Sequence, residues 1–146
     1  MAQSTDLQRA YIFQGLPPAD LEKAAAAAQE VSYNPGDYVY KKGDKGQTFY
    51  IIAEGKVELI AEGLKNSNTV FGHISEGGHF GEASLFTDKP RSLTVRAITT
   101  ARLLCFDQEQ FETVLLANPL LHRALDKALA ERLVLSFPDP TLKGLR

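Results

Sequence analysis

The sequence predicts a mainly β domain, a β-barrel or sandwich such as a jelly roll, with α-helices before and after it. Short apolar runs separated by glycine-rich turns fill the middle of the 146-residue chain, whose length is that of one ordinary domain. Helical patterns stand on both sides of this zone. Hydrophobic residues make up 44% of the chain and charged residues 23%, which is enough apolar material for a core. We expect one domain over residues 7–137 and a short C-terminal tail over 138–146.

The charge balance and the single cysteine limit the partners and the compartment. Sixteen Lys and Arg against eighteen Asp and Glu give a net charge of −2, without the basic patch that is typical of nucleic-acid-binding proteins. The sequence contains no run of eighteen apolar residues, which is about the length that a membrane-spanning helix needs. The polar segment Met1–Asp6 lacks the apolar core of a signal peptide. Cys105 has no partner for an intramolecular disulfide, which is typical of a reducing compartment. We therefore expect a cytoplasmic protein that binds neither nucleic acid nor a membrane directly.

The first zone, Leu7–Glu30, has a helical pattern. Pro17 and Pro18 suit the start of a helix, because proline is tolerated in the first turn and disfavoured later. Asp20 and Glu22 then place negative charge near the positive end of the helix dipole. The alanines that follow favour continuation of the helix.

The middle zone, Val31–Phe106, predicts strands. Asn34–Asp37 and Lys42–Gly46 contain the residues that turns prefer, and Glu54-Gly55 has the position of a hairpin tip. The strands are expected at Tyr38–Tyr40, Phe49–Ile52, Val57–Ile60, Thr69–Phe71, Ser92–Ala97 and Ala101–Phe106.

Two helices are expected after the strands. Asp107 is a candidate N-cap for a helix that runs to about Leu116, and Asn118 followed by Pro119 starts a second one that Pro138 ends. The second helix carries an apolar stripe, which either docks on the barrel or pairs two copies of the chain. Of these two alternatives we favour a homodimer through the last helix. The stripe consists of Leu121, Leu125, Ala128, Leu129 and Leu133.

Two features of the sequence predict an anion site. Arg91 is expected on the strand face that carries Leu93 and Val95, and a guanidinium buried on such a face needs an anion. Gly81–Ser84 resembles a glycine-entered helix start, whose free backbone N–H groups bind anions. Together they indicate a phosphate-sized ligand. The alternative is that Glu82 neutralises Arg91 in an internal ion pair, within a protein-interaction module that binds no ligand or a non-standard one.

The stretch Phe80–Ser92 resembles the phosphate-binding cassette of the cyclic nucleotide-binding domain family. That family includes protein kinase A regulatory subunits, cyclic-nucleotide-gated channels and bacterial catabolite activator proteins. Phe-Gly-Glu at 80–82, Leu85 three residues after the glutamate and Arg91 nine residues after it stand in the family's register. Turns and a hairpin upstream and two helical runs downstream are also similar, so the resemblance covers most of residues 7–136.

The resemblance implies a role for each residue of the cassette. Arg91 would pair with the exocyclic phosphate oxygens, and Glu82 would accept a hydrogen bond from the ribose 2′-hydroxyl. No residue on the last helix stands out as a reader of the base, so cyclic AMP is expected on family frequency, with cyclic GMP possible. The other implied contacts are backbone N–H groups of Ala83, Ser84 and Ser92 at the phosphate, Gly81 where the ligand comes close, and Phe71 against the base.

The resemblance also implies regulation rather than catalysis. Nucleotide binding would draw the cassette inward and repack the C-terminal helices, and this would regulate an effector protein that the sequence does not identify. We expect no output domain in this chain, no enzymatic activity and no catalytic cofactor. His73, His79 and Glu82 raise a cupin-like metal site as an alternative, but the close His-x-His pair typical of such sites is missing, so no metal ligands are predicted.

Overall fold

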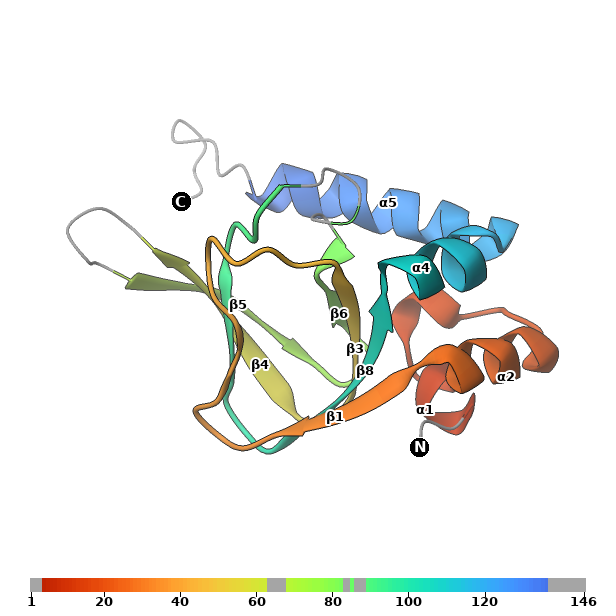
Figure 1. Cartoon of the computed structure of the whole chain (residues 1–146), viewed down its shortest axis with the longest axis horizontal. Helices are drawn as coiled ribbons and strands as arrows, with labels where there is room; N and C mark the ends of the chain where they lie inside the picture. The colour runs from red at the N-terminus through yellow and green to blue at the C-terminus, as the bar shows by residue number, and fades with distance from the viewer. Residues whose placement is uncertain (1–3, 63–67, 83–84, 86–88, 137–146) are drawn as a thin grey trace.

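The protein, seen here in a computed structural model that describes residues 4–62, 68–82, 85 and 89–136, is a two-sheet β structure with helices packed against one side (Figure 1). The sheets have the orders β1-β8-β3-β6 and β2-β7-β4-β5, and their pairings are antiparallel. The strands are β1 (Gln29–Tyr33), β2 (Tyr38–Tyr40), β3 (Thr48–Glu54), β4 (Lys56–Glu62), β5 (Asn68–Ser75), β6 (His79–Phe80), β7 (Thr94–Ala97) and β8 (Ala101–Asp107).

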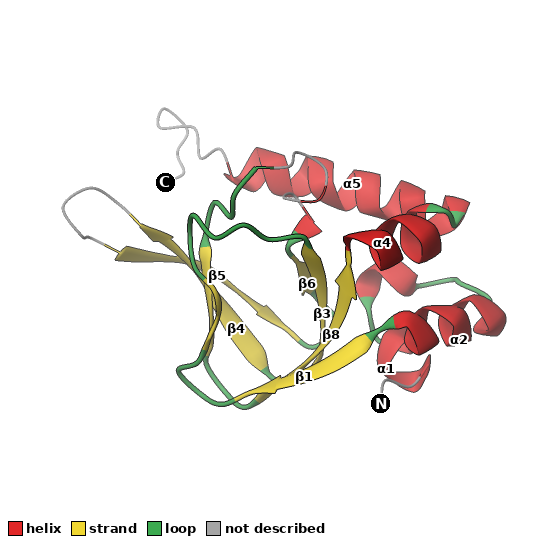
Figure 2. Ribbon diagram, in the orientation of Figure 1, coloured by secondary structure: helices red, strands yellow, loops and turns green. Residues whose placement is uncertain are grey.

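Helices precede and follow the strands. In Figure 2 the strands occupy the left and centre, while the helices gather on the right and along the top. The prediction of a mainly β fold with flanking helices is therefore confirmed. The helical elements are α1 (Ser4–Gln8), the 3-10 turn η1 (Tyr11–Phe13), α2 (Pro18–Ala27), α4 (Gln108–Gln110), the π-helical turn η3 (Phe111–Leu116) and α5 (Pro119–Ser136). Within the described segments, none of the helices is long and apolar enough to cross a membrane.

Strand β3 separates two apolar clusters. Phe49 and Ile51 face the helices, whereas Ile52 faces the space between the sheets, because successive side chains of a strand point to opposite faces. The helix-side cluster contains, among others, Leu21, Phe49, Phe106, Phe111, Leu115, Leu121 and Leu125. The cluster between the sheets contains Ile52, Val57, Phe80, Val95 and Leu103, among others. Phe49 and Phe80 lie next to the candidate site from opposite clusters.

The helix starts predicted from capping residues are confirmed. The carboxylate of Asp107 accepts from the Gln110 backbone N–H at 2.8 Å, and the Gln110 side chain accepts from the Asp107 backbone N–H at 3.0 Å. Oδ1 of Asn118 accepts from the backbone N–H of Leu120 at 3.0 Å, so α5 starts at the predicted place. These caps satisfy backbone donors that a helix start leaves without intrahelical acceptors.

Several predicted boundaries are wrong. The first helical zone is not continuous, and α2 ends at Ala27. Gln29 and Glu30 belong to β1, where they pair with Cys105 and Leu104 of β8, because pairing with a distant strand outweighs local helix propensity. The strand predicted from Ser92 begins only at Thr94. The two-residue strand β6 had no expected counterpart.

An ion-pair network joins the first helix to the sheet. The guanidinium of Arg102 on β8 donates to both carboxylate oxygens of Asp6 on α1, each at 3.1 Å. It also donates to Glu54 at 2.8 Å and to Glu30 at 3.4 Å. The hydrogen bonds that Arg102 donates to Asp6, the largest cause, and to Glu54 raise the pKa of Arg102 above its usual value, so the arginine stays charged. The network fixes α1 against β8, β1 and β3.

Candidate functional site

Arg91 lies in the connection that leads into β7. Its backbone N–H donates to the Asp44 carbonyl, and its carbonyl accepts from the Gly43 N–H, both at 2.8 Å. The chain bends at Ser92 and Leu93 before β7 begins, so Arg91 does not share a regular strand face with Leu93 as predicted. Its side chain is nevertheless buried, with the residue only 4% exposed.

The guanidinium of Arg91 is bound to backbone carbonyl groups. Nη1 donates to the Gly81 carbonyl at 3.0 Å and Nη2 to the Thr48 carbonyl at 2.9 Å. The buried Nε has no hydrogen-bond partner among the described residues. Because both acceptors are neutral, they orient the guanidinium without cancelling its charge, which favours an anion beside it.

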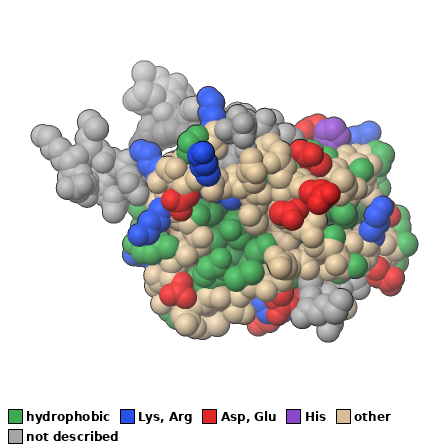
Figure 3. Space-filling view, in the orientation of Figure 1, with side chains coloured by type: hydrophobic (Ala, Val, Ile, Leu, Met, Phe, Trp, Pro, Cys, Tyr) green, Lys and Arg blue, Asp and Glu red, His purple; other side chains and the backbone are tan. Residues whose placement is uncertain are grey.

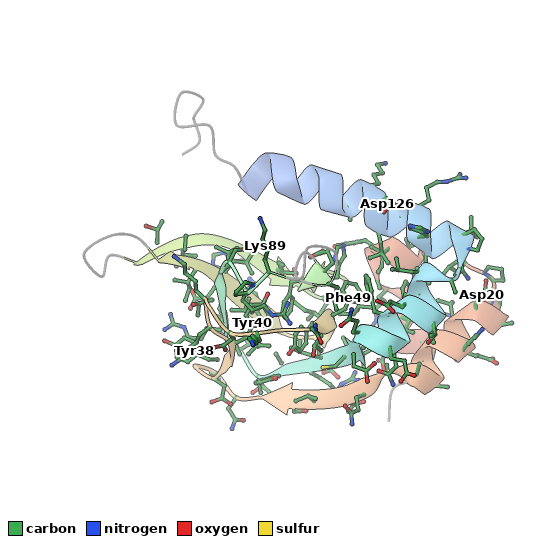
Figure 4. All side chains as sticks on the ribbon, turned by 45° about the horizontal axis from the view of Figure 1, so that its top comes forward. Asp20, Tyr38, Tyr40, Phe49, Lys89 and Asp126 are labelled. Carbon is green, nitrogen blue, oxygen red and sulfur yellow. The ribbon has the colours of Figure 1, made fainter. Side chains whose placement is uncertain are left out.

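Aromatic rings cover one side of this guanidinium. Cζ of Arg91 lies 4.1 Å from the ring centroid of Tyr40 and 6.0 Å from that of Tyr50, within cation–π range. The Tyr50 ring stacks on Phe80 at 4.9 Å. Figure 4 shows Tyr40 within the strand region, with Tyr38 nearer its left edge.

Tyr50 keeps its proton beside Arg91. Burial, the main cause, raises the pKa of its phenol to about 12, with smaller contributions from Cys105 and Tyr33, while Arg91 acts in the opposite direction. Burial likewise raises the pKa of Cys105 to about 12. Neither group supplies a negative charge near neutral pH, so neither neutralises the guanidinium.

Two glycines leave room for the arginine. A Cβ atom on Gly46 would collide with Nε of Arg91 and would come within 2.6 Å of Nη2. A Cβ on Gly81 would lie 2.7 Å from the Thr48 carbonyl oxygen and 3.1 Å from Nη1 of Arg91. Gly81 also has a φ of +91°, which side-chain-bearing residues rarely adopt. Gly46 therefore leaves room for the guanidinium where it lies, and Gly81 leaves room for the Thr48 carbonyl that binds it.

Glu82 is buried next to a histidine. Only 1% of Glu82 is exposed, and its Oε1 lies 2.8 Å from Nδ1 of His79. Arg91 is bound to carbonyl oxygens, and no ion pair joins it to Glu82, although both lie in the described part of the chain. The internal Glu82–Arg91 ion pair of the alternative hypothesis is therefore wrong.

A cationic cavity of about 350 Å³ adjoins Gly46. It is lined by Lys45, Gly46, Gln47, Lys89 and Pro90. Figure 4 shows Lys89 on the upper side of the barrel. On the face seen in Figure 3, Lys and Arg side chains are frequent at the left, around an apolar patch that Asp and Glu side chains also border. The two lysines in the lining favour an anionic ligand.

The remaining predicted site residues are distributed as follows. Ser92 is exposed next to Arg91. Phe71 is on β5, at the register shift opposite Leu59 and Ile60, and its side chain is outside the described part of the chain, as are Ala83 and Ser84. His73 is exposed on β5, and no three potential metal ligands converge among the residues that the structure describes.

The sequence did not identify three neighbours of Arg91, namely Tyr40, Gly46 and Thr48, and it raised His79 only as a candidate metal ligand. In the sequence, Tyr40 is only the end of an expected strand and Gly46 only the end of a turn. Thr48 acts through a backbone carbonyl, which no residue type reveals. For His79, the one available signal was its spacing of three residues from Glu82.

The model of the cyclic nucleotide-binding domain matches residues 30–118, which is more than half of the chain and includes Gly81, Glu82 and Arg91. The chain belongs to the cyclic nucleotide-binding domain family. The predicted family is thus confirmed.

Relatives come from two kinds of regulatory protein. The chain is 37% identical over 91 residues to the cAMP-dependent protein kinase regulatory subunit of Blastocladiella emersonii, covering 62% of this chain and 23% of that protein. It is 31% identical over 122 residues to the Cyclic AMP receptor protein of Thermus thermophilus, covering 84% and 56%. The crystal structure of the Thermus thermophilus Catabolite Activator Protein superimposes with a TM-score of 0.80 at 30% identity, covering 86% of this chain and 59% of that one. The chain thus spans about a quarter to just over half of these relatives.

Proposed function

We propose that this domain binds a cyclic nucleotide, with Arg91 as the phosphate-binding group. The observation that carries the proposal is the state of its guanidinium: it is buried, has only neutral carbonyl acceptors, and has an Nε–H without a partner among the described residues. An arginine that was purely structural would be expected to have a carboxylate as its partner. A phosphate would neutralise the charge and accept the remaining donors.

The other residues of the cassette take the roles that family membership suggests. Glu82 accepts a hydrogen bond from the ribose 2′-hydroxyl. Its burial supports this role, because a buried carboxylate strongly favours a ligand that donates to it. The remaining proposed contacts are the backbone N–H groups of Ala83, Ser84 and Ser92 at the phosphate, Gly81 beside it, and Phe71 at the base.

We propose cyclic AMP as the ligand, with cyclic GMP as the competitor to be tested. The names of two relatives, a cAMP-dependent protein kinase regulatory subunit and a Cyclic AMP receptor protein, support cyclic AMP over cyclic GMP. We infer that the domain is regulatory, without catalytic activity of its own, and acts in the cytoplasm on an effector protein.

Binding is proposed to repack the C-terminal helices. Leu85, within the cassette, packs against the same apolar cluster that holds Phe111 of η3 and Leu121 and Leu125 of α5. A cassette drawn towards a phosphate would therefore change the packing of both helical segments. Leu121 and Leu125 are buried within the chain, so a homodimer through α5 would have to use another face, such as that of the half-exposed Leu120.

Isothermal titration calorimetry with cyclic AMP, cyclic GMP and 5′-AMP tests the proposal. We expect micromolar or tighter binding of a cyclic nucleotide, weak binding of 5′-AMP, and at least about a hundredfold loss in Arg91→Ala, because charge-assisted hydrogen bonds to the phosphate are lost. Arg96→Ala is the matched control, since Arg96 pairs with Glu58 in a part-buried ion pair that does not involve Arg91.

Each outcome has a defined meaning. Affinity retained in Arg91→Ala would show that the site assignment is wrong. If no heat of binding is measured with any of the three ligands at two temperatures, the alternative of a protein-interaction module that binds no cyclic nucleotide is favoured.

A further inference from the structure

His79 occupies an unusual place for a histidine, between the ligand site and the helix-side core. It belongs to the two-residue strand β6 and pairs with Ile51 of β3. Phe80, the next residue, contributes to the cluster between the sheets, whereas the ring of His79 lies 5.6 Å from that of Phe49 in the helix-side cluster. Only 6% of His79 is exposed. The backbone of β6 thus directs a polar ring into a largely apolar environment.

One nitrogen of this ring reaches Glu82. Nδ1 lies 2.8 Å from Oε1, and the side chains of the two residues are 8% and 2% exposed. The contact has ion-pair distance, although the N–H is not aligned with the oxygen as a hydrogen bond. In a site sheltered from water, even an imperfectly aligned N–H dipole or imidazolium acts strongly on a carboxylate.

We propose that His79 is a positioning residue, which holds the Glu82 carboxylate where it can accept from the ribose 2′-hydroxyl and thereby selects ribonucleotides over deoxyribonucleotides. The inference rests on the proposed role of Glu82 in binding the nucleotide. Arg91 does not hold that carboxylate in the structure: its Nη1 and Nη2 donate to the carbonyl groups of Gly81 and Thr48, and no ion pair joins it to Glu82 in the described part of the chain. A carboxylate whose Oε1 already lies against His79 has fewer rotamers to lose, so the rotamer entropy lost on binding the sugar is reduced.

The competing explanation is that His79 only fills space beside Phe49. Two substitutions separate the explanations. His79→Phe keeps an aromatic ring next to Phe49 and removes both nitrogens. His79→Asn discards the ring but places an amide N–H donor near the position of Nδ1. If His79 only packs against Phe49, His79→Phe should retain the properties of the wild type better than His79→Asn. If His79 positions Glu82, His79→Asn should retain the preference for the ribonucleotide better than His79→Phe.

The readout is the ratio of the affinities for cyclic AMP and 2′-deoxy cyclic AMP, measured by calorimetry on folded protein. For the wild type we expect a ratio of roughly 10 to 100, the contribution of a hydrogen bond to a charged acceptor. His79→Phe should reduce this ratio at least about fivefold, while its affinity for the deoxy ligand stays near that of the wild type. His79→Asn should retain most of the ratio.

The outcomes separate this inference from the function on which it rests. Equal loss of affinity for both nucleotides in His79→Phe, or an unchanged ratio, would overturn the positioning role while leaving cyclic nucleotide binding in place. A wild type that binds neither nucleotide would overturn both. Should His79→Phe fail to fold in circular dichroism, His79→Asn decides: a ratio retained together with folding supports the inference, and a ratio lost in folded protein overturns it.

Discussion

Gly46→Ala is a small substitution directed at the binding guanidinium. The backbone of Gly46 does not have the positive φ that only glycine adopts readily, so alanine introduces no backbone strain. Its Cβ, however, would collide with Nε of Arg91 and would lie 2.6 Å from Nη2. The flexible end of the arginine can move, but it then leaves the Tyr40 ring and its two carbonyl acceptors.

The expected magnitudes follow from these contacts. Loss of one hydrogen bond between Arg91 and a phosphate weakens binding by about 1.5–3 kcal/mol, which corresponds to roughly 10- to 100-fold in affinity. Moving the guanidinium also disturbs its bonds to Thr48 and Gly81, at a cost of about 1–3 kcal/mol in stability. A gain of about 0.4–1 kcal/mol, from the lower entropy of the unfolded chain with alanine, offsets part of this cost.

Calorimetric titration with cyclic AMP, at a temperature where circular dichroism shows each variant folded, measures the effect. Gly72→Ala is the matched control, because it makes the same chemical change on β5 at a position where a Cβ meets nothing within 4 Å. Wild-type affinity in Gly46→Ala would refute the reasoning, since it would mean that the guanidinium in its observed position is not the group that binds the nucleotide.

Two further predictions concern Arg91's aromatic neighbour and the ion-pair network. Tyr40→Leu should weaken cyclic AMP binding severalfold in a titration, because the aromatic ring that stacks on Arg91 is lost. Tyr40→Phe keeps the ring and should bind as the wild type does. Equal effects of the two substitutions would exclude the stacking role. Arg102→Ala should lower the free energy of unfolding in urea by roughly 1–3 kcal/mol, because the largely buried Asp6 loses its main partner. Arg96→Ala, which breaks a more exposed pair, should cost less than about 1 kcal/mol, and equal losses would contradict this ranking.

The fold could be predicted from the sequence wherever side-chain period and turn residues agree. Strands such as β3 and β8 have apolar runs long enough to recognise, and the caps at Asp107 and Asn118 are local signals. The boundary at Gln29 could not be predicted, because β1 begins where it pairs with β8, more than seventy residues later in the chain. Strand β6 has two residues, which is too few to show a period.

The candidate site also has one part that the sequence predicts and one part that it does not. Gly81, Glu82 and Arg91 stand in one short, recognisable stretch, and the structure brings Arg91 against the Gly81 carbonyl. The groups that hold them come from elsewhere: the Thr48 carbonyl is 43 residues from Arg91. Tyr40 also precedes the cassette by several strands. Contacts of this kind depend on the tertiary arrangement of side chains and backbone, for which the local pattern carries no signal.

The size of the proposed switch can be compared with the contacts available to it. Shifting a two-state domain from about 1% to about 99% active requires a ligand to favour one state by roughly 5.5 kcal/mol. Two charged contacts, at Arg91 and at Glu82, contribute about 1.5–3 kcal/mol each, which is of the required order only if both are made in one state. The buried rings beside Glu82 offer a way to meet this condition. His79 lies 5.6 Å from Phe49, and Phe49 lies 5.3 Å from Phe111 in η3. A domain in which η3 has moved away would lose the packing of Phe49 that keeps His79 beside Glu82, so we expect the ribose contact to be strong in one arrangement of the C-terminal helices and weak in the other.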